Sequence, residues 1–246
     1  MRRALAIAVG VSVLAVPVLA LALPAPTIQI GLGETEGASW APVVKMLGLL
    51  TLLALAPAVI LCTTSFTRIL VVLSFLRQAI GTHSAPPGQV VVLLSLMLTG
   101  VVMAPIAARV DEVAIRPYLD GSLPEEEALE AAKGPIREFL LRQTRENDLE
   151  LFYRMTRTPA PQTQADVAMH LLVPAFLISE LCTAFEMGFL LFLPFVLIEI
   201  VVASILSSMG MVMLPPTIVS MPLKLLLFVA VDGWSLLAQS LVASFG

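Results

Sequence analysis

Ionisable side chains lie inside apolar stretches of this 246-residue sequence, where a charge is costly unless protein or water covers it. Charged side chains in such stretches usually form buried ion pairs or line a polar path. The candidate buried polar residues are Glu180, Glu186, Glu199, Lys224, Asp232, Arg68 and Arg77.

Two of these charges have a symmetrical position about a turn. Glu199 lies 13 residues before Val212 and Lys224 lies 12 residues after it. If both arms are helical, at about 1.5 Å per residue, both side chains lie roughly 18–20 Å from the apex. The spacing predicts a buried ion pair, and the alternative is that the two charges face solvent independently.

The turn itself is rich in methionine. Met209, Met211 and Met213 surround Gly210 and Val212, directly before two prolines. Methionine is flexible and polarizable, so a ring of such turns could close a pore and still deform around varied cargo. The alternative is that these methionines only fill gaps in a core.

Enzyme chemistry finds no support in the residue types. The two histidines, His83 and His170, have no partner in a nucleophile, metal or phosphate motif. Cys62 and Cys182 are in no metal spacing and are predicted to be reduced core residues. A net charge of −4 without a basic stripe argues against nucleic acid. We therefore predict no catalytic residue, no cofactor and no metal.

The elements that position these residues are predicted to be apolar helices. The chain is 58% hydrophobic and 13% charged, with a mean hydropathy of +0.96, which indicates an all-α membrane protein. Charge-free runs predict a first apolar helical hairpin over 43–107 and a second over 167–246. We expect prolines to interrupt the helices, which should therefore pack against protein or line a cavity. These prolines are Pro57, Pro86, Pro87, Pro105, Pro174, Pro194, Pro215, Pro216 and Pro222.

The N-terminus has the pattern of a secretory signal. Arg2 and Arg3 precede an apolar run that ends in the small-x-small site Ala20–Ala22. We predict a cleavable signal peptide over 1–22 and a periplasmic linker over 23–42. The alternative is an uncleaved first transmembrane helix.

The segment 108–166 is predicted to be a polar, helical periplasmic domain because it holds 12 acidic and 8 basic residues. Ser122 is the expected cap of its first helix, which Gly134–Pro135 should end. A second helix is expected from Ile136 to about Arg157. The loop 81–88, with Arg68 and Arg77, would then face the cytoplasm, as would the turn 211–216.

Several long motifs resemble the FliP/SctR family of type III export-gate subunits, in the family's order. They are Leu52–Thr82, Pro86–Val90, Met103–Pro105, Pro174–Phe189 and Pro222–Trp234. Overall proportions and the signal sequence favour the flagellar branch of that family.

The resemblance implies a pore subunit of the flagellar gate, in the bacterial inner membrane at the basal body. Several copies, a pentamer in the family, would assemble in membrane lipid with FliQ- and FliR-like subunits and other export-apparatus membrane proteins. Unfolded flagellar proteins would be the cargo. The family's constriction loop maps onto Met211, Val212 and Met213, with Val212 in place of its middle methionine. Glu199 stands where the family usually has aspartate.

Two other functions remain alternatives. A stand-alone transporter would also use broken helices and buried charges, but it predicts internal repeats, and the two halves show no convincing match. An intramembrane enzyme would need a nucleophile and a base, which the sequence lacks.

Overall fold

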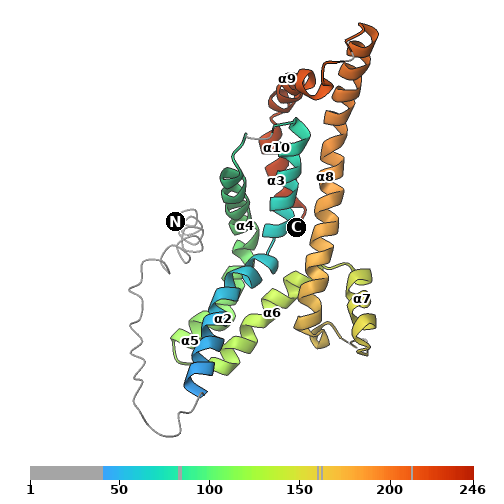
Figure 1. Ribbon diagram of the computed structural model, residues 1–246. Helices are drawn as coiled ribbons and strands as arrows, with labels where there is room; N and C mark the ends of the chain where they lie inside the picture. The colour runs from blue at the N-terminus through green and yellow to red at the C-terminus, as the bar shows by residue number, and fades with distance from the viewer. Residues whose placement is uncertain (1–40, 83–84, 160, 162, 212) are drawn as a thin grey trace. The chain divides into compact units, whose positions relative to one another are not determined.

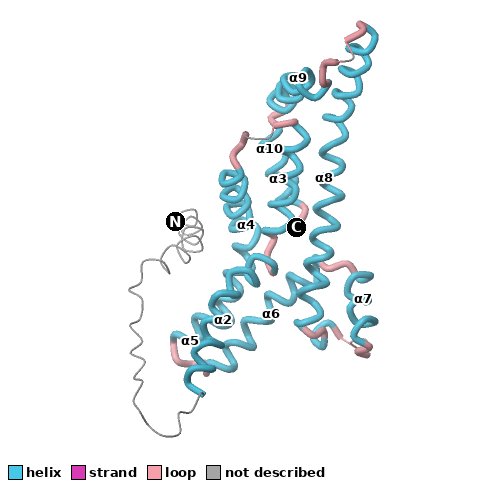
Figure 2. The backbone as a smooth tube through the Cα atoms, viewed as in Figure 1, coloured by secondary structure: helices cyan, strands magenta, loops and turns pink. Residues whose placement is uncertain are grey.

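The computed structural model describes residues 41–246, except for 83, 84, 160, 162 and 212. These residues form helices and loops, with no strand among them (Figure 2). The predicted all-α class is therefore confirmed. The signal peptide expected over 1–22 and nearly all of the linker over 23–42 lie outside the described residues. The chain divides into two compact units, Met1–Leu61 and Cys62–Gly246.

The described part of the first unit is a single helix, α2 (Ala41–Cys62), with Pro57 inside it. Leucine, valine and isoleucine side chains are exposed around its whole circumference. A helix that is apolar on all sides is typical of a membrane span. Its Val43–Cys62 stretch is long and apolar enough to cross a bilayer.

The second unit holds the other long apolar helices, drawn in Figure 1. Two of them, Gly88–Leu119 and Met169–Ser208, could each span a membrane, and two shorter helices bent by 65° could form a further span together. The chain is therefore a multi-pass membrane protein. The apolar helices of this unit are α3 (Phe66–Ile80), α4 (Gly88–Val110), α8 (Met169–Ser208), α9 (Pro216–Ala230) and α10 (Gly233–Ala243), and the short α5 (Arg116–Leu119) ends the Gly88–Leu119 stretch.

Helix α4 does not end at residue 107, where the apolar hairpin was expected to stop. It continues through a π-helical turn, Asp111–Ile115, into α5. Arg116 pairs with Asp111 across this turn at 2.7 Å. The expected boundary between the apolar and polar parts therefore lies within one continuous helix.

Prolines interrupt the helices at fewer positions than expected. Helices run through Pro57, Pro105, Pro174, Pro194 and Pro222. Of the nine prolines named above, only the Pro86–Pro87 and Pro215–Pro216 pairs lie at helix boundaries, where they precede or begin a helix and need no donor. Inside a long apolar helix, flanking hydrogen bonds and packing outweigh the loss of one backbone donor.

The core of the second unit forms where α3 lies along α8. Arg68 apart, the buried side of α3 is apolar, and it packs on Leu172 and Phe176 of α8. Further along, Phe75 lies directly over Gly188, where an added Cβ would come within 2.5 Å of the ring. Phe185 and Phe192 contact the same ring edge-on. This close approach fixes the position of α3 along α8.

The polar segment folds into α6 (Glu125–Gln143) and α7 (Glu146–Thr156), and the predicted break at Gly134–Pro135 is wrong. The clash before a proline involves the Cβ of the preceding residue, which Gly134 lacks, so the helix continues. The helix ends instead at Thr144. Ser122 does not cap it, because its hydroxyl donates to the carbonyl of Pro117.

Different elements lie at the two ends of the second unit (Figure 1). The turn between α8 and α9 lies at the upper end of the view, and the loop from α3 to α4 also lies on the upper side. Helices α5 and α7 lie on the lower side. Helix α8 connects these regions as a single rod of 40 residues, about 60 Å long at 1.5 Å per residue.

Candidate functional site

The methionine turn begins where Gly210 stops α8. Gly210 adopts a left-handed conformation with φ of 75°. Its N–H donates to the carbonyl of Ser207 at 3.1 Å, and the N–H of Met211 donates to the carbonyl of Leu206 at 2.9 Å. These two bonds form a Schellman motif, which satisfies the last carbonyls of a helix. The turn is therefore a defined structure that presents its side chains outward.

The described methionines of this turn do not fill the core of the second unit. Met213 is 96% exposed, Met209 66% and Met211 44%. Val212 lies outside the described residues. Exposed methionines clustered at one turn are a place where other chains can pack, so the core-filling alternative is not supported for the single chain.

Below the turn, the structure brings Glu199 and Lys224 together. The Nζ of Lys224 donates to Oε2 of Glu199 at 2.6 Å. The Lys224 side chain is 4% exposed and that of Glu199 is 30% exposed. The contact joins α8 to α9 and fixes the two arms of the hairpin at one depth. Lysine is the more buried partner, so the carboxylate is what keeps its charge compensated.

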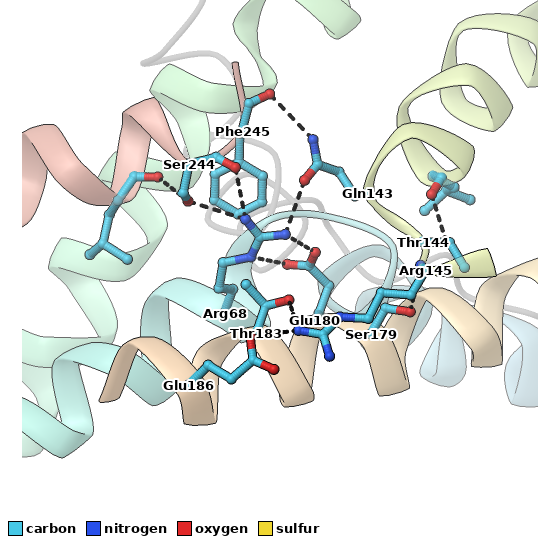
Figure 3. A network of polar contacts seen from close by, with 12 residues as sticks. Arg68, Gln143, Thr144, Arg145, Ser179, Glu180, Thr183, Glu186, Ser244 and Phe245 are labelled. Atoms are coloured by element: carbon cyan, nitrogen blue, oxygen red, sulfur yellow. Dashed lines mark hydrogen bonds and ion pairs between the residues drawn. The ribbon is translucent and has the colours of Figure 1, made fainter. Parts of the chain in front are cut away.

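A second ion pair, which the sequence did not predict as a pair, joins Arg68 to Glu180 (Figure 3). Arg68 lies in the first turn of α3 and is 3% exposed, and Glu180 is fully buried in α8. The Nε of Arg68 donates to Oε2 of Glu180 at 2.9 Å, and Nη2 donates to Oε1. Arg68 is therefore buried, as predicted, and it lies in a helix rather than in a loop.

Arg68 also holds the ends of two other helices. Its Nη1 donates to the carbonyl of Ser244 at 3.0 Å and to the hydroxyl at 3.1 Å. Its Nη2 donates to Oε1 of Gln143 at 3.0 Å, and the guanidinium lies 3.9 Å from the ring centre of Phe245. Gln143 in turn donates to the carbonyl of Phe245 at 3.3 Å. We call Arg68, Glu180, Gln143, Ser244 and Phe245 the arginine node.

The adjacent turn of α8 fixes the corner between α6 and α7. The hydroxyl of Ser179 accepts from the backbone N–H of Arg145 at 3.0 Å and donates to Asp148 at 2.6 Å. The guanidinium of Arg145 donates to Thr183 at 3.1 Å and to Glu186 at 2.8 Å. The bond to the Glu186 carboxylate raises the pKa of Arg145. This polar contact explains why the helix break occurs at residue 144, which local sequence did not indicate.

Three other predicted buried groups are not buried in the single chain. Glu186 and Asp232 are exposed, and Arg77 is half-buried. Arg77 makes no ion pair among the described residues. Cys182 is also exposed rather than a core residue, and both Cys62 and Cys182 are free thiols. The apolar sequence around these residues did not show which side of the helix each occupies.

The described residues hold no group of three or more histidine, cysteine, aspartate or glutamate side chains that could bind a metal ion. The arginine node could have been suspected from sequence, because an arginine and a glutamate in apolar segments each need a partner. The identity of the partners could not, because Arg68 and Glu180 are 112 residues apart.

These features define a multi-pass membrane protein in which paired charges inside a helical body support an exposed apolar turn. The model of the FliP family matches residues 49–241, and the chain therefore belongs to the FliP family.

Several relatives share this assignment over most of their length, and each is named flagellar biosynthetic protein FliP. The relative from Caulobacter vibrioides is 50% identical over 89% of this chain and 82% of its own length. The relative from Bacillus subtilis is 47% identical over 82% of this chain and 91% of its own. The relative from Aquifex aeolicus is 43% identical over 82% of this chain and 85% of its own.

Proposed function

We propose that this chain is a structural pore subunit of the flagellar type III export gate, which conducts unfolded flagellar proteins across the bacterial inner membrane. Membership of the FliP family and the names of its relatives support the flagellar role. The multi-pass apolar helices support a place in the membrane. The proposal gives the chain a structural role and no catalytic one.

The observation that carries the proposal is the exposed methionine turn at the end of α8. Met209, Met211 and Met213 are exposed together on a turn that two hydrogen bonds hold in shape. When several copies assemble around an axis, their turns form one apolar plug. An apolar constriction blocks hydrated ions by dewetting, while an extended polypeptide can push flexible thioether side chains aside.

The assembly is proposed to contain several copies of this chain, in the number of five that the family resemblance suggests. FliQ- and FliR-like subunits and other membrane proteins of the export apparatus would complete it. Exposed apolar side chains along α8 and α9, among them Phe189, Leu197, Ile200 and Leu226, give these partners and lipid a surface to cover.

The experiment replaces Met211, Val212 and Met213 with glycine in cells that express the complete export apparatus. We expect the subunit to assemble normally and the membrane to leak ions, measured as conductance or as poor growth in high salt. Bulky phenylalanine at the same positions should keep the seal and slow the secretion of flagellar subunits.

A matched control is Met155→Gly, which removes an equally exposed methionine from α7, away from the turn. It should neither leak nor slow secretion. Glycine variants of the turn that assemble, secrete and remain tight to ions would rule out the plug. The turn would then only connect two helices.

A further inference from the structure

The guanidinium of Arg68 uses all of its hydrogen-bond donors inside the fold (Figure 3). An arginine has five N–H groups in a rigid fork. In this chain they make five bonds, two to Glu180, two to Ser244 and one to Gln143. Each of these partners belongs to a different helix or helix end, so the single side chain ties α3, α6, α8 and the end of α10 together.

A contribution to stability does not by itself explain why the chain buries the Arg68–Glu180 pair. Burying two charges costs desolvation energy that their attraction only partly returns, and apolar side chains of similar volume are often as stable. The five directed bonds of the fork do something that apolar packing cannot. They fix the angles at which four elements meet, because each bond loses strength when its geometry changes.

The angle of α8 at this point determines where the methionine turn lies. Glu180 and Met209 are 29 residues apart on the same helix. At 1.5 Å per residue this is a continuous helical arm of about 44 Å, which includes Pro194. A tilt of roughly 5° at Glu180 would move the turn by about 4 Å, comparable to the width of a side chain. Flexible side chains can adjust to small movements, but a backbone displacement of this size in each copy would separate the turns that form the seal.

Arg68 also holds the far end of the returning hairpin. Ser244 and Phe245 follow α10, so Arg68 fixes the end of the segment that begins at the methionine turn. Between these two points, Lys224 joins α9 to α8 at Glu199. The node and this pair therefore hold the returning α9–α10 segment on α8 at two depths.

We propose that Arg68 is a positioning residue of the gate: its fork fixes the tilt of α8 and the return of α10, and thereby sets where the methionine turn closes the pore. This inference rests on the proposed gate function, and it adds that closure is determined about 44 Å from the seal by a residue whose side chain is buried within its own chain.

The test uses Arg68→Lys in cells with the complete export apparatus. Lysine keeps the positive charge for Glu180, so the fold and the assembly should survive, but one ammonium group cannot bond Glu180, Gln143 and Ser244 together. We expect normal recovery of the assembled complex, with an ion leak or a several-fold loss of secretion. A second variant, Arg68→Met with Glu180→Leu, removes both charges and should assemble with the same gate defect.

The same measurements are made on the glycine variant of Met211, Val212 and Met213. Its ion leak gives the value expected for a fully open seal. The matched control exchanges the exposed pair Arg109 and Glu138, which are joined at 2.6 Å in the polar region, and it should leave gating unchanged. A leak in the glycine variant with a tight, fully active Arg68→Lys gate would overturn the positioning role alone. An absence of leak in the glycine variant would overturn the proposed plug instead. Failure of both Arg68 variants to assemble would also overturn the inference, since Arg68 would then serve only the fold.

Discussion

The two ends of α8 are stabilised in opposite ways. At Glu180, nearer its beginning, a buried carboxylate accepts two hydrogen bonds from Arg68, whose other three bonds go to Ser244 and Gln143 of the same chain. At Met209, at its end, the methionine side chains are apolar, and the described residues of the chain leave them 44–96% exposed. The first end is complete within one chain, while the second is suited to contact with other chains.

This difference indicates that the two parts of α8 have different structural roles. Directed polar bonds give a single geometry, because they weaken quickly when atoms move. Methionine contacts tolerate movement, because dispersion has little directional preference and the side chain is flexible. A gate subunit needs the first property where it must hold its shape and the second where cargo passes.

The largest loss of stability is expected at the arginine node. Glu180→Ala leaves the buried Arg68 charge without its carboxylate, which should cost about 3–5 kcal/mol of stability. Thermal unfolding of the purified protein in detergent measures this loss. Glu186→Ala on the same helix removes an exposed carboxylate and should cost about 0–1 kcal/mol. Equal losses in the two variants would show that the node is not special.

Alanine substitutions in the Glu199–Lys224 pair, which lies between the two ends of α8, should cost less stability, and the two costs should differ. Glu199→Ala leaves the buried Lys224 ammonium unpaired and should cost about 1.5–3 kcal/mol. Lys224→Ala leaves a carboxylate that is 30% exposed and can be hydrated, so its cost should be lower. The exchange of the two residues should recover part of the loss. Strictly additive losses in the double alanine variant would mean that the groups are not coupled.

A still smaller effect is expected at Gly210, which ends α8 with a φ of 75°. Gly210→Ala places a Cβ in open space, so its cost of about 1 kcal/mol should come from backbone strain alone. Gly100→Ala is the matched control, because Gly100 lies in α4, also with open space at its Cβ position. It should stabilise the protein by up to about 1 kcal/mol. Unfolding measurements that give the same sign for both would contradict the strained turn.

The smallest effect concerns the exposed pair of Arg109 and Glu138, joined at 2.6 Å. The hydrogen bond from Arg109 lowers the pKa of Glu138 below its ordinary value of 4.5. The pair therefore contributes stability above pH 4.5, and the contribution disappears as the pH falls through the lowered pKa. The stability difference between the wild-type protein and Glu138→Gln should be constant from pH 7 to 5 and vanish in stronger acid. If this stability difference grew as the pH fell, it would contradict a lowered pKa of Glu138.

Local sequence rules succeeded where partners are close along the chain. The spacing of Glu199 and Lys224 about a turn predicted two side chains at one depth, and the structure places them in contact. They failed where tertiary contacts decide. The break at Thr144 depends on Ser179 of α8, and Pro135 did not end its helix because Gly134 removes the clash.

The sequence predicted buried charges correctly at Arg68, Glu180 and Lys224 but wrongly at Glu186 and Asp232, which are exposed. A helix that is apolar along its whole length has no amphipathic pattern, so sequence does not show which face is covered. Glu180 and Glu186 lie six residues apart on α8, yet the first is buried at the arginine node and the second is exposed beside Arg145. The arginine node joins four separate segments, so local sequence could mark Arg68 and Glu180 as charges in need of partners but could not pair them across 112 residues.

The most direct test of the exposed end is a cross-link between copies. Met213→Cys is placed in a chain whose Cys62 and Cys182 are replaced by serine, and the complete export apparatus is then oxidised in membranes. If the methionine turns of neighbouring copies meet at the axis, their Cα atoms come within about 7 Å and disulfide-linked dimers of this chain form. Met155→Cys on α7 should remain monomeric under the same oxidation. A Met213→Cys chain that assembles and secretes but yields only monomers would contradict the account.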